Sequence, residues 1–180
     1  MLGRAVDGLG WARRDMRVLD IAAGNGVSGE ALAAEGLHPV LGTDIVASVR
    51  EAALRDRPGL YDRYLTLDLL QMSDVQRAEV ASLQANALSC VAPVGRHGSE
   101  LPPAVLVAAA ALLAPDALVV YMHDPQRGLP DAVTAELWRD GLGGGTEAEE
   151  LQRRRYVHRR TVNGAPFEMD GVVWRLTRTS

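Results

Sequence analysis

The chain has 180 residues, of which 47% are hydrophobic and 23% are charged, and its formal net charge at pH 7 is −4. These values are typical of one folded domain and exclude a disordered chain. No apolar run approaches the roughly 20 residues of a membrane helix. The N-terminal segment MLGRAVDGLGWARRD is too polar for a signal peptide. We therefore expect a single domain over residues 1–180, in the cytoplasm and without a membrane partner.

Two features of the composition exclude certain kinds of chemistry. All 19 basic residues are arginine, so a Schiff-base lysine and a P-loop lysine are both excluded. Cys90 is the single cysteine, which excludes an intramolecular disulfide and a multi-cysteine zinc site, and we expect no metal. A pI near 5.6 gives no support for nucleic-acid binding, which usually needs a basic domain.

Apolar β-forming segments alternate with helical segments along most of the chain. In chain order the predicted elements are helix Arg4–Arg13, strand Arg17–Ile21, helix Val27–Glu35, strand Pro39–Thr43, helix Val46–Arg55, strand Tyr64–Leu67, helix Met72–Leu83, strand Ala87–Val91, loop Pro93–Pro103, helix Ala104–Leu113, strand Ala117–Met122 and helix Asp131–Asp140. Two further β-rich segments, Leu151–Val162 and Val172–Arg178, flank an Asn163-Gly164 turn. The pattern predicts an α/β domain whose parallel strands are followed by an antiparallel hairpin.

A glycine turn follows the first predicted strand, in the segment Asp20–Gly26. Gly24 and Gly26 allow a sharp turn and let a ligand approach the backbone. The helix just beyond supplies unpaired N–H groups. Asp44 ends the second strand, where a carboxylate can accept both hydroxyls of a ribose, and Asp68 ends the third, near the expected adenine edge. Three acidic strand ends around one glycine turn predict an adenosine site.

Two cofactor classes compete for this site. The run from Gly24 to Gly29 matches G-x-G-x-x-G, which is also found in dinucleotide-binding proteins. However, Asp20 lies four residues before the first glycine, and its carboxylate would repel a pyrophosphate. The same carboxylate would attract a sulfonium and an ammonium group. Its position therefore favours S-adenosylmethionine over a dinucleotide.

The segments VLDIAAGNGVSGEAL, PVLGTDIV, YLTLDLL, ALSCVAPVG and LLAPDALVVYM together resemble the class I S-adenosylmethionine-dependent methyltransferases. The family motif acidic-x-Gly-x-Gly-x-Gly is matched at Asp20, Gly24 and Gly26, with Ala22 in place of the first glycine. The resemblance implies a Rossmann-like, doubly wound, mostly parallel seven-stranded sheet. Its last strand would be antiparallel, in agreement with the predicted hairpin.

The resemblance also implies which residues bind the cofactor. These are Asp20, Ala22, Gly24, Asn25, Gly26, Asp44, Ile45, Asp68, Leu69 and Cys90. By similarity the methionine part lies beside the glycine turn, Asp44 binds the ribose, and adenine packs on Ile45. Simpler roles remain open, because Asp44 can cap a helix and Asp68 can belong to a turn. Cys90 lies in the apolar run ALSCV, which is also typical of a buried small hydrophobic residue.

Catalytic residues are harder to assign from the sequence. His123 and Asp124 directly follow the fifth strand, at the carboxyl edge where α/β proteins bind ligands, and are our candidates. Val91-Ala92-Pro93-Val94 stands where methyltransferases of amino-nucleobases carry Asn/Asp-Pro-Pro-aromatic, which argues against base N-methylation. The arginines between 153 and 160 would alternate between the two faces of a strand, which favours a solvated edge strand over a basic patch.

The function that these observations favour is methyl transfer from S-adenosylmethionine to a small molecule, at an O, N or C nucleophile. One alternative is a methyltransferase-like domain that binds the cofactor without methylating, or that serves as a partner subunit. Another is an NAD(P)-dependent dehydrogenase. We expect a small-molecule partner and no nucleic acid. We expect the substrate pocket to be either open or closed by a second subunit, most simply in a symmetric homodimer.

Overall fold

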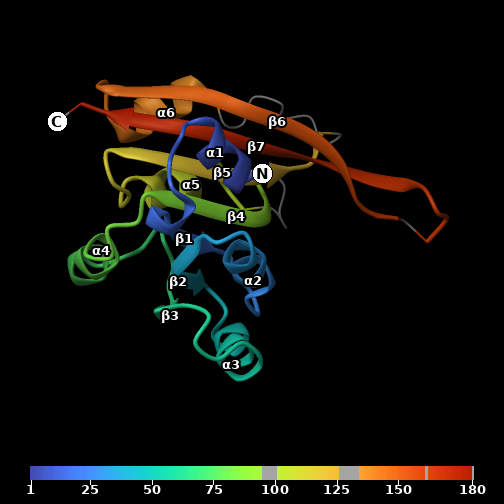
Figure 1. The fold of residues 1–180 in the computed structure, drawn as a ribbon. Helices are drawn as coiled ribbons and strands as arrows, with labels where there is room; N and C mark the ends of the chain where they lie inside the picture. The colour runs from blue at the N-terminus through green and yellow to red at the C-terminus, as the bar shows by residue number, and fades with distance from the viewer. Residues whose placement is uncertain (95–100, 126–133, 161, 180) are drawn as a thin grey trace.

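The computed structural model describes residues 1–94, 101–125, 134–160 and 162–179. Its centre is a seven-stranded sheet in the order β3-β2-β1-β4-β5-β7-β6 (Figure 1). The strands are β1 (Arg17–Ile21), β2 (His38–Asp44), β3 (Arg63–Thr66), β4 (Ala87–Val94), β5 (Asp116–His123), β6 (Thr146–Arg160) and β7 (Pro166–Arg178). Strands β1 to β5 pair in parallel, whereas β7 is antiparallel to both β5 and β6. The predicted parallel sheet with an antiparallel C-terminal hairpin is confirmed.

Helices lie on both faces of the sheet, as a doubly wound fold requires. They are α1 (Leu2–Gly8), α2 (Val27–Ala34), α3 (Ala47–Asp56), α4 (Asp74–Ala81), α5 (Pro103–Ala110) and α6 (Ala135–Leu142). Leu2 of α1 and Leu32 of α2 pack in one apolar cluster with Val173 of β7. Leu106 of α5 and Trp138 of α6 pack in another, on the opposite face. Both faces of the parallel strands are therefore buried, which explains their nearly continuous apolar sequence.

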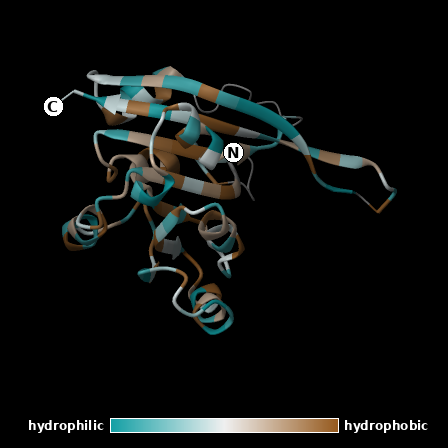
Figure 2. Ribbon diagram, in the orientation of Figure 1, coloured by the Kyte–Doolittle hydropathy of each residue, from teal (hydrophilic) through white to brown (hydrophobic). Residues whose placement is uncertain are grey.

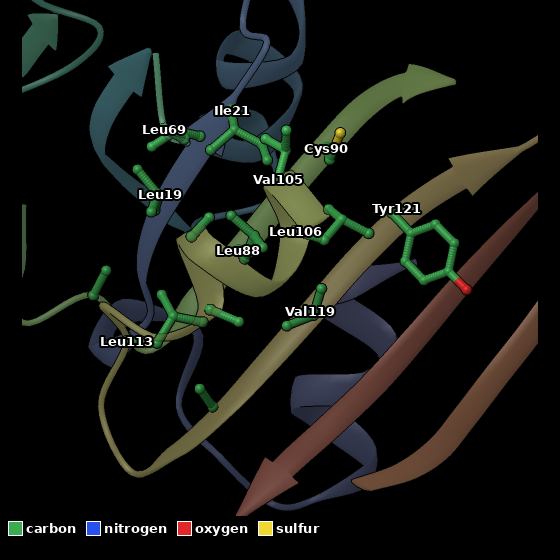
Figure 3. Close-up of a cluster of buried hydrophobic side chains, with 14 of the residues drawn as sticks. Leu19, Ile21, Leu69, Leu88, Cys90, Val105, Leu106, Leu113, Val119 and Tyr121 are labelled. Carbon is green, nitrogen blue, oxygen red and sulfur yellow. The ribbon is translucent and has the colours of Figure 1, made fainter. Parts of the chain in front are cut away.

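The larger core cluster packs helix α5 against the central strands, whose ends form the candidate site. In Figure 3, Val105 and Leu106 of α5 lie over Leu88 of β4 and Val119 of β5. Figure 2 shows the same central strands as largely hydrophobic, whereas the edge strand β6 carries long hydrophilic stretches. The charged segment that predicted an edge strand does form one.

Local chemistry moves several element ends away from their predicted positions. The first helix ends at Gly8 rather than Arg13, because the chain turns through Gly10 at a φ of +70°. Helix α4 begins at Asp74 rather than Met72, because Ser73 and Gln76 form a capping box at its N-terminus. Strand β4 continues to Val94, past a register shift between Cys90 and Pro93. The predicted start of the last helix at Asp131, and most of the predicted loop, lie outside the described residues.

The β6–β7 hairpin extends beyond its neighbour. Pairing between β5 and β7 stops at Asp170, whereas pairing between β6 and β7 continues to Arg160 and Pro166. The end of the hairpin therefore projects past the sheet as a two-stranded arm (Figure 1). In the described part of the chain, no helix has the length and apolar character needed to cross a membrane.

Candidate functional site

The strand order places a ligand crevice at the end of β1. Strand β1 has β2 on one side and β4 on the other. Strands β2 and β3 are added on one side of β1, and β4 and β5 are added on the other side, so the strand order reverses at β1. Ligands of open α/β sheets bind beyond the strand ends at such a point. Two cavities, of about 250 Å³ and about 620 Å³, meet at Ala22, the residue that follows β1. We call them the smaller and the larger cavity.

The smaller cavity collects the predicted adenosine residues. Asp44, Ile45, Asp68 and Leu69 line it together with Ala22. Six further residues that the sequence did not single out complete the lining: Thr43, Leu67, Leu70, Leu101, Pro102 and Val105. The side chain of Ile45 is 65% exposed, so an apolar surface is left uncovered at the cavity. This arrangement suits a flat aromatic ring with polar edges.

Asp44 joins three parts of the site. Its Oδ2 accepts a hydrogen bond of 3.1 Å from the Gly24 N–H, and its Oδ1 accepts one of 3.0 Å from the Val46 N–H before α3. The carboxylate thus holds the glycine turn beside the second strand. Each carboxylate oxygen can accept a further hydrogen bond, so these contacts leave capacity for ligand hydroxyls. The N-cap of α3 is Val46, without a side-chain cap hydrogen bond, so Asp44 does not cap this helix.

Asp68 is shared between a turn and the cavity in the same way. Its Oδ1 accepts from the Leu70 N–H at 3.0 Å, and its Oδ2 accepts from the Gln71 side-chain amide at 2.9 Å. These bonds fix the turn that follows the third strand. Leu69, which lies inside this turn, is buried and lines the smaller cavity. The turn therefore presents one apolar and one acidic residue to the same space.

The glycine turn has three left-handed residues in alternation. Ala22, Gly24 and Gly26 have φ angles of +49°, +55° and +91°. A left-handed conformation is uncommon for any residue with a Cβ atom, so Ala22 adopts the backbone shape of the glycine that the family motif has there. A Cβ built on Gly24 would meet no atom within 4 Å, and the backbone there is open to a ligand.

Asp20 lies fully buried beneath the turn. Its Oδ2 accepts hydrogen bonds from the Ser28 hydroxyl at 2.7 Å and the Tyr61 hydroxyl at 2.8 Å, whereas its Oδ1 has no hydrogen bond within the described part of the chain. Burial raises the pKa of this carboxyl to about 6, against the opposing effect of the Ser28, Tyr61 and Ser89 hydroxyls. Ser89, the register partner of Asp20 on β4, lines the larger cavity together with Ser28. An unsatisfied carboxylate oxygen at this place fits a cationic ligand group.

Two tyrosines that the sequence analysis missed support the turn. The Tyr64 hydroxyl donates to the Gly24 carbonyl at 2.5 Å, and the Tyr61 ring packs edge-on against Tyr64 at 5.5 Å between centroids. A Cβ on Gly29 would lie 2.2 Å from the Tyr61 hydroxyl oxygen. The third glycine of the G-x-G-x-x-G run therefore serves to bring α2 close to Tyr61. In the sequence, the only indication of this contact was the glycines that face the Tyr61 ring.

The larger cavity lies between α2, β4, β5 and the hairpin. Cys90 lines it, is buried, and has a thiol whose pKa burial raises to about 12, so the thiol is a poor nucleophile at neutral pH. Gly24, Asn25 and Gly26 line neither of the two cavities, and the positive φ angles of the two glycines shape the turn. The Asn25 carbonyl accepts from the Arg57 guanidinium at 3.0 Å, which anchors the turn to the end of α3.

His123 and Asp124 line neither of these two cavities. The Arg153 guanidinium lies 3.0 Å from Nε2 of His123, and the carboxylate of Asp170 lies 3.8 Å from the same atom. A guanidinium can only donate, so Nε2 is the acceptor and its lone pair is engaged. Burial, assisted by the charge of Arg153, lowers the pKa of His123. Asp124 is buried beside it.

No group of three or more metal-ligating side chains is assembled among the described residues. No family model matches the sequence. No curated protein sequence matches it either.

Comparison with solved structures gives many matches to the whole fold. One is PH1948 of Pyrococcus horikoshii, named as a candidate RNA methyltransferase, with 12% identity, a TM-score of 0.64, and coverage of 99% of this chain and 82% of that one. Another is an S-adenosylmethionine-dependent methyltransferase of Anabaena variabilis, with 13% identity, a TM-score of 0.61, and coverage of 99% and 84%. The N-methyltransferase NodS of Bradyrhizobium japonicum has 16% identity, a TM-score of 0.58, and coverage of 91% and 86%. The chain has the fold of the class I methyltransferases.

Proposed function

We propose that the protein transfers a methyl group from S-adenosylmethionine to a small-molecule acceptor. The observation that carries the proposal is the pair of cavities that meet at Ala22, one lined by the predicted adenosine residues and the other large enough for an acceptor. The fold shared with methyltransferases of low sequence identity supports it. In this proposal the cofactor lies across Ala22, with its adenosine in the smaller cavity.

Each end of the cofactor would meet suitable chemistry. Asp44 would accept hydrogen bonds from the ribose hydroxyls, and Ile45 would pack on adenine. Beyond Ala22 the methionine part would lie over Ser28, next to the buried Asp20. Oδ1 of Asp20, which accepts no hydrogen bond from the described residues, would attract the ammonium and sulfonium charges strongly, because the carboxylate is buried away from water.

A bound S-adenosylmethionine would supply an electrophilic methyl group. The C, N or O nucleophile of the acceptor would take this methyl group and release a proton, while the electron pair of the broken C–S bond would go to sulfur. The chain's own contribution is to hold the acceptor in line and to exclude water. Such positioning is worth about 7–11 kcal/mol in favourable cases. The apolar walls of the larger cavity serve both purposes. His123 and Asp124 stay our candidates for a proton-accepting pair.

Binding and methylation assays distinguish the proposed function from three others. Calorimetric titration with S-adenosylhomocysteine and with NAD tests the cofactor: we expect binding of the first and none of the second, and the opposite result would favour a dehydrogenase. A methylation assay on a library of small acceptors, with radiolabelled cofactor, then tests the reaction. Cofactor binding without transfer to any small acceptor, but with transfer to total RNA, would contradict the small-molecule proposal. Binding without any transfer would favour a non-methylating or partner-subunit role.

A further inference from the structure

The larger cavity has an almost entirely apolar wall. The wall residues come from the N-terminal segment, α2, β4, β5 and the hairpin: Met1, Leu2, Val27, Ala31, Leu32, Val91, Ala92, Val120, Met122 and Tyr156. A volume of about 620 Å³ is in the range of pockets that hold drug-sized organic molecules, about 300–1,000 Å³. Polar groups are confined to the region of Asp20, where Ser28 and Ser89 lie, and to two charged residues, Arg154 and Glu35.

Arg154 differs from its neighbours on β6. Arg153 binds Glu150 through two hydrogen bonds of 2.9 and 2.6 Å, and Arg155 binds Asp170 through two of 2.9 and 3.2 Å. Because side chains alternate along a strand, Arg154 points to the other face, where it lines the larger cavity. Within the described residues Arg154 has no hydrogen bond and no ion pair. It is a free cation beside an apolar pocket.

The acidic residue at the cavity does not neutralise Arg154. Glu35 lies at the end of α2, where the Arg13 guanidinium donates a hydrogen bond of 2.9 Å to the Glu35 carbonyl oxygen. The charge of Glu35 also contributes to raising the pKa of Arg13, which places the carboxylate and this guanidinium close together. Glu35 therefore already has a cation beside it, and the charge of Arg154 remains available to a ligand.

We propose, building on the methyl transfer proposed above, that the acceptor is an apolar organic anion whose anionic group binds Arg154. Its apolar body lies against the walls from α2, β4 and β5, and its nucleophilic end lies toward Ala22. A guanidinium forms paired, charge-assisted hydrogen bonds with a carboxylate, sulfonate or phosphate, so a single arginine orients such a molecule as well as attracting it. The buried carboxylate of Asp20 repels the same anionic group and so fixes the direction of binding.

The test uses two fluorescent probes with the same ring system and different charge. Anilinonaphthalene sulfonate is an apolar anion, and phenylnaphthylamine is its neutral counterpart. We expect Arg154→Gln to weaken binding of the sulfonate roughly tenfold and to change binding of the neutral probe by less than about twofold. Arg160→Gln, on the same strand but away from both cavities, is the matched control and should change neither. Ala31→Phe fills the cavity and should weaken both probes.

Each other outcome overturns the proposal in a recognisable way. Equal loss of both probes in Arg154→Gln, or equal loss in Arg160→Gln, means that the charge of Arg154 does not select the ligand. An unaffected Ala31→Phe variant means that the probes bind elsewhere. If Arg154→Gln weakens S-adenosylhomocysteine but not methylthioadenosine, which lacks the amino-acid part, Arg154 binds the cofactor carboxylate instead. Failure of the parent protein to bind S-adenosylhomocysteine contradicts the proposed function, and the probe titrations do not depend on that result.

Discussion

The Tyr61 hydroxyl donates a 2.8 Å hydrogen bond to the Asp20 carboxylate, across 41 residues of sequence. Tyr61 comes from the segment between α3 and β3, and Asp20 lies inside β1. The bond ties β1 to the segment that leads into the edge strand β3, and burial, together with the charge of Asp20, raises the pKa of the tyrosine. The support of the proposed cofactor site therefore depends on a residue outside the glycine motif.

Close packing at Gly29 is expected to decide the stability of the turn. Gly29→Ala would place a Cβ 2.2 Å from the Tyr61 hydroxyl oxygen and should lower the free energy of unfolding by about 1–3 kcal/mol, measured by urea denaturation. In a Tyr61→Ala background the clash is absent, and the same change should stabilise the protein, because alanine is the better helix residue. Gly8→Ala, where a Cβ meets nothing within 4 Å, is the control. Equal effects of Gly29→Ala in both backgrounds would contradict the packing role.

The buried carboxylate of Asp20 is expected to lower the stability of the ligand-free protein at neutral pH. Its pKa is about 6 in the folded protein against 3.8 when unfolded, so its contribution to stability is fully present below pH 4 and is lost as the pH rises through about 6. At pH 7 the Asp20→Asn variant, free of ligand, should be more stable than the parent by on the order of 1–3 kcal/mol, and the difference should vanish near pH 4.

The same Asp20→Asn variant tests whether Asp20 attracts the ammonium group of the cofactor. It should bind S-adenosylhomocysteine, which carries an ammonium group, more weakly than the parent, and should bind methylthioadenosine equally well. Thermal unfolding between pH 4 and pH 8 and calorimetry with both nucleosides measure the two effects. A variant that is less stable than the parent at pH 7 while its cofactor affinity is unchanged would show that Asp20 has a structural role only.

The meeting of Asp44 and Asp68 at the smaller cavity was predictable because both residues lie at strand ends. Asp44 and Asp68 follow apolar β segments, and parallel strands bring their carboxyl ends to one edge, so sequence order alone placed both at one cavity. The same reasoning placed His123 at that edge, but an end position does not fix the direction of the side chain. In the structure its Nε2 instead contacts Arg153 and Asp170 of the hairpin.

The supporting residues were not predictable from motifs. Tyr61 lies in a loop whose position relative to β1 depends on the packing of α2 and α3, and the sequence indicates it only through the glycines that face its ring. Arg154 is one of three consecutive arginines, and only the pairing of β6 with β7 decides which of them faces the cavity. Alternation indicated that the three would be divided between two faces, but it did not indicate which face carries a pocket.

His123 is expected to matter more for stability at low pH than for cofactor binding. Burial lowers the pKa of His123 below its usual value of 6.5, so its contribution to stability is present above that pH and is lost as the pH falls. His123→Gln should therefore lose less stability than the parent between pH 7 and pH 5, with unchanged affinity for S-adenosylhomocysteine. If His123 is also the base, the rate of methylation should fall, since general base catalysis contributes typically about 10²–10⁴-fold. Equal turnover would remove it from the mechanism.

Asp44 is expected to be the main anchor of the cofactor. Hydrogen bonds to a charged acceptor contribute roughly 1.5–3 kcal/mol each, and two ribose hydroxyls would meet this carboxylate. Asp44→Ala should therefore weaken S-adenosylhomocysteine binding by about 3–5 kcal/mol, or on the order of 10²–10³-fold or more. The variant also frees the Gly24 and Val46 N–H groups, so part of the loss reflects a looser turn. Asp44→Asn keeps one carbonyl acceptor and should lose noticeably less.

The control for Asp44→Ala is Asp62→Ala, which removes an exposed carboxylate paired with His38 away from both cavities. Both variants should keep the circular dichroism spectrum of the parent, because Asp44 lies at a strand end and not in the core. Calorimetry with S-adenosylhomocysteine and with methylthioadenosine should show the same loss for both nucleosides, since the ribose is common to them. Affinity within about threefold of the parent in folded Asp44→Ala would exclude the ribose assignment, because a carboxylate that accepts hydrogen bonds from both ribose hydroxyls contributes far more than that.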